Sequence, residues 1–197
     1  AQLQALLPGW NVFFGSAIDE FTAQGRQQFG NVIATRLPVL QIQHHPLPMP
    51  AEADMRCMPR MCSVVTVNDP TLGPVRIMTA HLEYFSRRQR MAQAGALRAL
   101  QMQACALADA PPQPASDGSP YQTKPHTRHA VLCGDFNFEP HEPEYAVLSA
   151  PWAAGEEGCL QAGQWRDVLG GGSLKVKRSL KTEVPAHGVK VFVLEGQ

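Results

Sequence analysis

The sequence has no excess of charge, no Cys-x-x-Cys pair and no apolar run long enough to span a membrane. Lysine and arginine together number 17, as do aspartate and glutamate, so no global positive field attracts nucleic acid, although a local basic patch is still allowed. The five cysteines are odd in number and irregularly spaced, which disfavours a disulfide framework or a cysteine zinc site. We therefore expect a reduced, cytoplasmic protein without a membrane span.

The sequence does have enough apolar residues for a core. They make up 44% of 197 residues, against 17% charged residues, which is typical of one globular domain. Apolar or alternating runs predict strands, at 10–14, 29–35, 39–43, 61–67, 75–81, 130–137, 174–184 and 189–194. Polar or proline-rich composition predicts loops at 15–28, at 44–59 with His44 and His45 facing solvent, and at 111–125. Many strands with few helices predict an α/β fold with mostly antiparallel sheets and helices on their outer faces.

One long helix is predicted to begin after Ser86, because Gln89 follows it at the spacing of a capping box. Apolar residues then recur every three or four positions, at Met91, Ala94, Leu97, Leu100, Ala104 and Leu107. Four arginines lie largely off this stripe, namely Arg87, Arg88, Arg90 and Arg98. We expect them on a solvated face, with a phosphate-binding patch as the less favoured alternative.

Two polar residues, Asp135 and Asn137, close the apolar run that starts at Ala130. Side chains alternate along a strand, so residues two positions apart can point the same way. A carboxylate suits a hard metal ion or an attacking water, and an amide can donate to a phosphate oxygen. Taken alone, the pattern also fits a polar turn after a core strand.

Two histidines stand at the ends of predicted strands. His81 ends the 75–81 strand, and His187 precedes the 189–194 strand. Histidine moves protons near neutral pH, so two histidines, a carboxylate and an amide would suffice to activate water and steady a phosphoryl transition state. A divalent metal would neutralise the developing charge. For each histidine the alternative is a hydrogen-bonded structural role.

Four segments, in chain order, resemble motifs of the endonuclease/exonuclease/phosphatase superfamily. They are residues 29–39, Thr79-Ala80-His81-Leu82, Arg90 with Gln93, and Gly134-Asp135-Phe136-Asn137, and all fall within residues 10–150. The resemblance implies a four-layer α/β/β/α sandwich, two facing sheets flanked by helices. It also implies cleavage of phosphoester bonds with Mg²⁺ or Mn²⁺.

The same resemblance implies roles for the matching residues. Asp135 would orient or deprotonate the attacking water, Asn137 would hold a phosphate oxygen, and both would be metal ligands. His81 would bind the phosphate and stabilise its negative charge. His187 would match a general-base histidine, although Ala186 stands where the family has the aspartate that orients this imidazole.

Two other parts of the family pattern have no match. Family members have an early strand that ends in a metal-binding glutamate, and nothing before Trp10 matches it. They also have a late strand with a sequence similar to Ile-Asp-Tyr, and residues 170–173 stand at its position here. A sandwich without central strands would expose edges and apolar faces. We therefore expect a single domain over 1–197 whose first strands and a segment near 170–173 are missing from this sequence. The alternative is a shortened and inactive domain.

The leading hypothesis is a metal-dependent hydrolase of phosphoester bonds, whether phosphodiesterase, nuclease or phosphatase, that acts as a monomer. Its water would be activated by Asp135 and His187. Nucleic acid is among the candidate substrates, although zero net charge argues mildly against tight, sequence-independent DNA binding. The alternative is a catalytically inactive domain of the same fold that binds a phosphorylated ligand or a protein partner.

Overall fold

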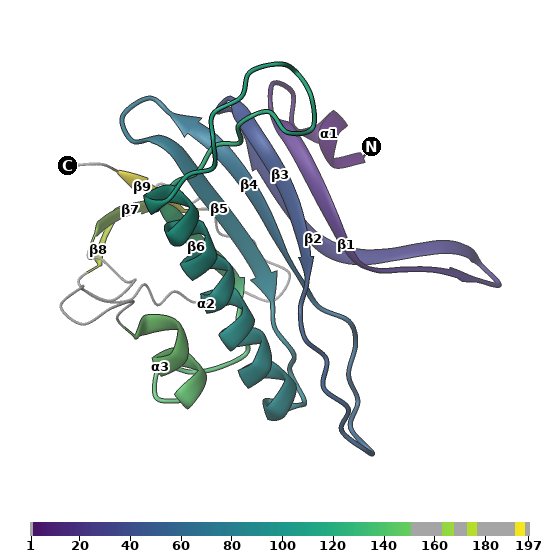
Figure 1. The fold of residues 1–197 in the computed structure, drawn as a ribbon. Helices are drawn as coiled ribbons and strands as arrows, with labels where there is room; N and C mark the ends of the chain where they lie inside the picture. Colours follow the sequence, from purple (N-terminus) through teal and green to yellow (C-terminus); the bar gives the residue numbers. More distant parts are fainter. Residues whose placement is uncertain (1, 151–162, 168–172, 177–191, 196–197) are drawn as a thin grey trace. The chain divides into compact units, whose positions relative to one another are not determined.

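The computed structural model describes residues 2–150, 163–167, 173–176 and 192–195 (Figure 1). The chain divides into two compact units, Ala1–Leu148 and Ser149–Gln197. The elements up to residue 149 are, in order, α1 (Gln2–Leu6), β1 (Asn11–Thr22), β2 (Gly25–Thr35), β3 (Val39–Pro46), β4 (Met61–Asp69), β5 (Gly73–His81), α2 (Arg87–Asp109), β6 (Ala130–Asp135) and α3 (Pro143–Ser149). The expectation of one domain over 1–197 stays a prediction.

The second unit contains a three-stranded antiparallel sheet in the order β8-β7-β9. Its strands are β7 (Gly163–Asp167), β8 (Ser173–Val176) and β9 (Phe192–Glu195). The sequence did not predict β7. The strands expected at 174–184 and 189–194 are described only where they overlap β8 and β9, and their remaining residues lie outside the described part of the chain.

The first unit is built around a four-stranded sheet in the order β3-β4-β5-β6. The first three strands pair antiparallel as expected, and β6 pairs with β5 in parallel. A parallel pair needs a crossover connection, and α2 lies in that connection. Apolar side chains pack between α2 and one sheet face, among them Val64, Met78 and Leu97.

The other face of this sheet packs against the antiparallel pair β1–β2. Ile33 of β2 joins Val65, Val67 and Val75 in a second buried cluster. Residues 62–67 of β4 are therefore buried on both faces. Helix α2, the four-stranded sheet and the β1–β2 sheet are stacked layers (Figure 1), which confirms the α/β sandwich class.

The prediction of a loop at 15–28 is wrong, because β1 and β2 continue through these residues as a long hairpin. Its far half extends beyond the sheet in Figure 1, and Asp19 and Arg26 pair there across the strands at 2.6 Å. Most residues of this ribbon are polar, and its apolar residues Ile18 and Phe21, three positions apart, do not follow the two-residue alternation of a half-buried strand. Among the described residues, no helix is long and apolar enough to cross a membrane.

The segment after β3 is irregular, as expected, but it begins later than the sequence predicted. His44 and His45 belong to β3, where His44 is exposed and His45 is half-buried, so the prediction of two solvent-facing loop histidines is wrong for His45. Side chains of α2 hold the segment in place. The amides of Gln93 and Gln89 donate to the carbonyls of Pro48 (3.1 Å) and Pro50 (3.0 Å).

Candidate functional site

The ends of β5 and β6 bring His81 and Asp135 together. The two residues are paired in register, and because the strands are parallel their carboxyl ends lie at the same edge of the sheet. His81 Nε2 lies 3.8 Å from Asp135 Oδ2. The side chain of Asp135 is 66% exposed and that of His81 is 34% exposed, so both remain accessible to a ligand.

Glycine at position 134 allows β6 to approach β5 this closely. A Cβ atom there would lie 1.8 Å from the carbonyl oxygen of Ala80, which is far inside van der Waals contact. Its φ of +141° is also in the region that residues with a side chain rarely adopt. The Gly134-Asp135 pair in the motif therefore reflects a steric requirement of the strand pair.

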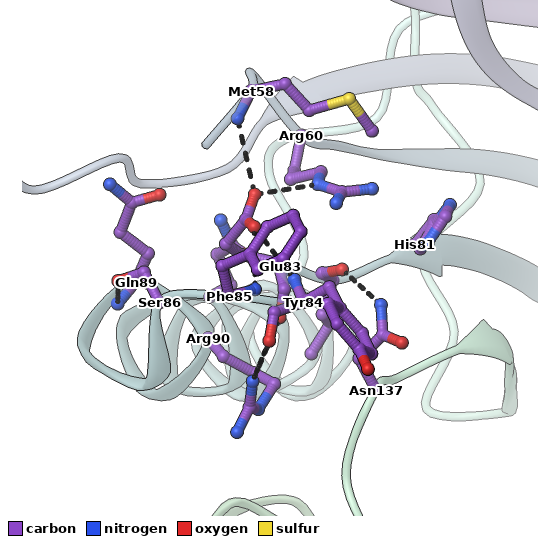
Figure 2. A network of polar contacts seen from close by, with 12 residues as sticks. Met58, Arg60, His81, Glu83, Tyr84, Phe85, Ser86, Gln89, Arg90 and Asn137 are labelled. Carbon is purple, nitrogen blue, oxygen red and sulfur yellow. Dashed lines mark hydrogen bonds and ion pairs between the residues drawn. The ribbon is translucent and has the colours of Figure 1, made fainter. Parts of the chain in front are cut away.

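Asn137 is fixed beside Asp135 by two hydrogen bonds. Its backbone N–H donates to Asp135 Oδ1 (3.1 Å). Its Nδ2 donates to the carbonyl of Leu82 (2.9 Å), and Figure 2 draws this bond as the dashed line from Asn137. Its φ is +52°, a left-handed conformation that asparagine tolerates better than most residues. The structure therefore brings three of the four predicted site residues together, and His187 lies outside the described residues.

The environment of His81 favours its neutral form. Burial lowers the pKa of His81 below its usual value, as does the positive charge of Arg60, while Asp135 and Glu83 oppose the shift. Phe29 lies against the ring, with a centroid separation of 6.2 Å. A neutral imidazole can donate a hydrogen bond to a phosphoryl oxygen, but it adds no positive charge.

Glu83 is a buried carboxylate of this region that the sequence did not single out. Its Oε1 accepts from the backbone N–H groups of Tyr84 (2.9 Å) and Phe85 (3.0 Å). Its Oε2 accepts from the N–H of Met58 (3.3 Å) and from Arg60 Nε (3.2 Å). Burial raises the pKa of Glu83, but these bonds and the Arg60 charge outweigh it, and the pKa lies below its usual value. Because both oxygens are engaged, Glu83 is not available as a metal ligand.

The expectation of a solvated Arg90 is wrong. Arg90 is buried, and its Nη1 donates to the carbonyls of Glu83 (3.2 Å) and Tyr84 (2.9 Å). Its Nε lies 3.3 Å from Oε1 of Glu144, whose side chain is fully buried. Arg87 and Arg88 are exposed as expected, whereas Arg98 is partly buried and donates to the carbonyl of Val147. Arg90 is therefore structural, because it ties the segment after His81 to α3.

Gln93, the second residue of that motif, has a similar role. Its Oε1 accepts from the Glu83 N–H (2.8 Å), while its Nε2 reaches the Pro48 carbonyl (3.1 Å). The Arg-x-x-Gln pair thus holds the segment that follows His81, and Gln93 also ties the segment around Pro48 to α2. No local pattern predicts these contacts, because their partners lie outside the helix, six to 45 residues away in the chain.

The described residues offer a divalent metal a small set of oxygen donors. Asp135 Oδ2 and the amide oxygen of Asn137 accept no hydrogen bond from a described residue, so both could be ligands. Among the described residues, no group of three or more His, Cys, Asp or Glu side chains could hold a metal ion. Mg²⁺ is often bound by one or two carboxylates, with water and substrate phosphate completing its shell, and the observed donors fit only such a site.

The comparisons with known proteins found similarity to solved structures only. No protein-family model matches the sequence, and no curated protein matches it significantly. An endonuclease/exonuclease/phosphatase family protein from Bacteroides thetaiotaomicron is 18% identical, over 74% of this chain and 47% of that one, with a TM-score of 0.49. A mannosyl-6-phosphatase from the same species is 17% identical, over 74% of this chain and 49% of that one, with a TM-score of 0.48. ANGEL2, a 2',3'-cyclic phosphatase, is 20% identical, over 75% of this chain and 37% of that one, with a TM-score of 0.45.

The first of these structures bears the name of the family that the four sequence motifs resemble. This chain spans less than half the length of each of these three structures.

Proposed function

We propose that this chain is a phosphoester hydrolase that depends on Mg²⁺ or Mn²⁺. The observation that carries the proposal is the placement of His81, Asp135 and Asn137 at the ends of two adjacent parallel strands. A histidine, an exposed carboxylate and a fixed amide at one edge of a sheet suit the positioning of a phosphoryl group and a water. Its substrate is a phosphoester, with nucleic acid among the candidates, and its monomeric state and cytoplasmic location remain predictions.

Each residue has a stated role in this proposal. The carboxylate of Asp135 orients the attacking water or accepts its proton. Neutral His81 donates a hydrogen bond to a phosphoryl oxygen. Asn137 keeps its Nδ2 on the Leu82 carbonyl and so holds its amide oxygen in one direction. His187 completes the set as a general base that acts with Asp135.

Asp135 and Asn137 would hold the metal through the carboxylate and the amide oxygen. The bound ion would neutralise charge on the phosphoryl oxygens. The fit is limited to a sparsely liganded site, so we expect weak, millimolar-range binding without substrate, of the order known for the weakest oxygen-ligand sites.

A hydrolysis screen tests the proposal. The chain is assayed against p-nitrophenyl phosphate and bis-p-nitrophenyl phosphate with Mg²⁺, with Mn²⁺ and with a chelator. We expect hydrolysis of at least one ester that requires the metal and is abolished by the chelator. Hydrolysis that the chelator leaves unchanged contradicts the metal dependence, and no hydrolysis of either ester under any condition contradicts the proposal.

A second candidate is a catalytically inactive domain that binds a phosphorylated ligand or a protein partner. The small number of donors around Asp135 among the described residues favours it. Thermal unfolding with and without Mg²⁺ separates the two, because a ligand that binds only the folded state raises its stability. An inactive domain should unfold at the same temperature at all Mg²⁺ concentrations, whereas a metal-dependent hydrolase should be stabilised.

A further inference from the structure

Arg60 is a buried cation beside the candidate site. It precedes β4, at the end of the segment that α2 holds in place, and only 6% of its surface is exposed. Its carbonyl accepts from the Leu47 N–H at 2.8 Å, and its Nε donates to Glu83 Oε2 at 3.2 Å. The guanidinium is thus fixed from its backbone and from one of its nitrogens.

Nη1 of Arg60 is buried, and no described residue accepts a hydrogen bond from it. A guanidinium carries five N–H donors, and burial of a charged donor without an acceptor is unfavourable. In Figure 2 the guanidinium extends from Glu83 toward His81. The effect of its charge on the pKa of His81 agrees with this proximity. The unfilled donor therefore points to a missing acceptor near His81.

Glu83 is well placed to hold Arg60. Three backbone N–H groups donate to its carboxylate, those of Met58, Tyr84 and Phe85, so the carboxylate keeps its position and its charge without Arg60. Arg60 uses one nitrogen on Glu83 and keeps the others for a ligand. This arrangement presents a cation in a fixed direction, at the cost of little further side-chain entropy on binding.

We propose that Arg60 is a further substrate-binding residue, whose guanidinium donates to a non-bridging oxygen of the phosphoryl group bound beside His81, and that Glu83 is its positioning residue. The proposal rests on the proposed function and deepens it. A phosphoryl group next to the Asp135 carboxylate brings two anionic groups together, and a fixed guanidinium would offset their repulsion. Arginine pairs with phosphate through short, charge-assisted hydrogen bonds.

Binding of inorganic phosphate tests this without relying on turnover. Calorimetric titrations compare the wild-type chain with Arg60→Met and Arg60→Lys, in Mg²⁺ and in chelator. Arg76→Met is the matched control, because Arg76 is equally buried at 6% but bonds Gln101 of α2 and lies five residues before His81 on β5. Circular dichroism of each variant confirms folding, and Arg60→Lys, which keeps the charge, is retained if Arg60→Met does not fold.

We expect Arg60→Met to weaken phosphate binding about tenfold or more, the usual effect of losing a hydrogen bond between charged groups. Arg60→Lys should weaken it less, and Arg76→Met should leave it unchanged.

Equal affinities in wild type and in both Arg60 variants overturn the proposal, as an ordered water would then satisfy Nη1. The hydrolysis screen distinguishes failure of this proposal from failure of the proposed function. If the wild type cleaves esters and Arg60→Met keeps the wild-type affinity for phosphate, only the role of Arg60 is refuted. A wild type that neither cleaves esters nor binds phosphate refutes the proposed function as well.

Discussion

His81 and Asp135, far apart in the sequence, lie 3.8 Å apart because they are paired in register on adjacent parallel strands. The backbone continues this pairing past the strand ends, since the Leu82 N–H donates to the Asp135 carbonyl at 2.9 Å. The relative position of the imidazole and the carboxylate is thus set by the sheet and not by a loop. Sites built on strands keep their geometry more precisely than sites built on loops.

The left-handed conformation of Asn137 gives the first prediction. Asn137→Ala removes the hydrogen bond to Leu82 and leaves a residue with a Cβ at a φ of +52°. Asn137→Gly removes the same bond without that strain. We expect the alanine variant to be less stable by about 1 kcal/mol than the glycine variant in urea unfolding. Both should lose hydrolytic activity, and equal stability of the two variants would show that the backbone at 137 is unstrained.

The buried pair of Arg90 and Glu144 gives a prediction about stability. Arg90→Met leaves the fully buried Glu144 carboxylate with the exposed Arg87, at 3.6 Å, as its one remaining cationic neighbour among the described residues. Breaking a buried ion pair from one side typically costs about 3–5 kcal/mol, so we expect a loss of that order in denaturant unfolding at pH 7.

Two controls accompany this variant. Arg88→Met changes an exposed neighbour that bonds only a carbonyl, that of Ala51, among the described contacts, and should cost less than about 1 kcal/mol. The double variant Arg90→Met/Glu144→Gln removes the buried charge and should recover part of the loss. If Arg90→Met is no less stable than Arg88→Met, Arg90 is not the anchor between the segment after His81 and α3.

The pH dependence of stability tests the environment of His45. Burial lowers the pKa of His45 below its usual 6.5, and the charges of Arg76 and His44 lower it further. The unfolded chain therefore binds a proton before the folded chain does, so the free energy of unfolding should fall as the pH drops through 6.5 toward the lowered pKa. His45→Gln has no such proton and should lose less stability between pH 7.5 and pH 5.5. Parallel losses in the two proteins would contradict this assignment.

Much of the first unit could be predicted because its signals are local. The apolar run from Ala130 predicted β6, and the alternation before His81 predicted β5. Ser86 is the residue that caps α2, through a 3.0 Å bond from the Gln89 N–H. Residues 75–81 also divide between the two faces as expected, with Val75 in one cluster and Met78 in the other.

What the sequence could not supply are contacts between distant segments. Arg90 lies off the apolar stripe of its helix and so resembles a solvated residue, yet α3 brings a carboxylate over it. Glu83 and Arg60 carry no local pattern, because their pairing depends on the segment before β4 folding back against the end of β5. The hairpin tip was missed for a related reason, since cross-strand partners such as Asp19 and Arg26 stabilise it without burial.

The most direct test of the proposed active site is the metal-dependent kcat/KM of Asp135→Asn on the ester that the wild type cleaves best. The control is Asp19→Asn, which makes the same substitution at an aspartate in the exposed hairpin. We predict that Asp135→Asn lowers kcat/KM by about 10²–10³-fold, as loss of a preorganised catalytic group does, while Asp19→Asn stays within about twofold of wild type. A folded Asp135→Asn variant with wild-type kcat/KM would contradict the assignment of the site.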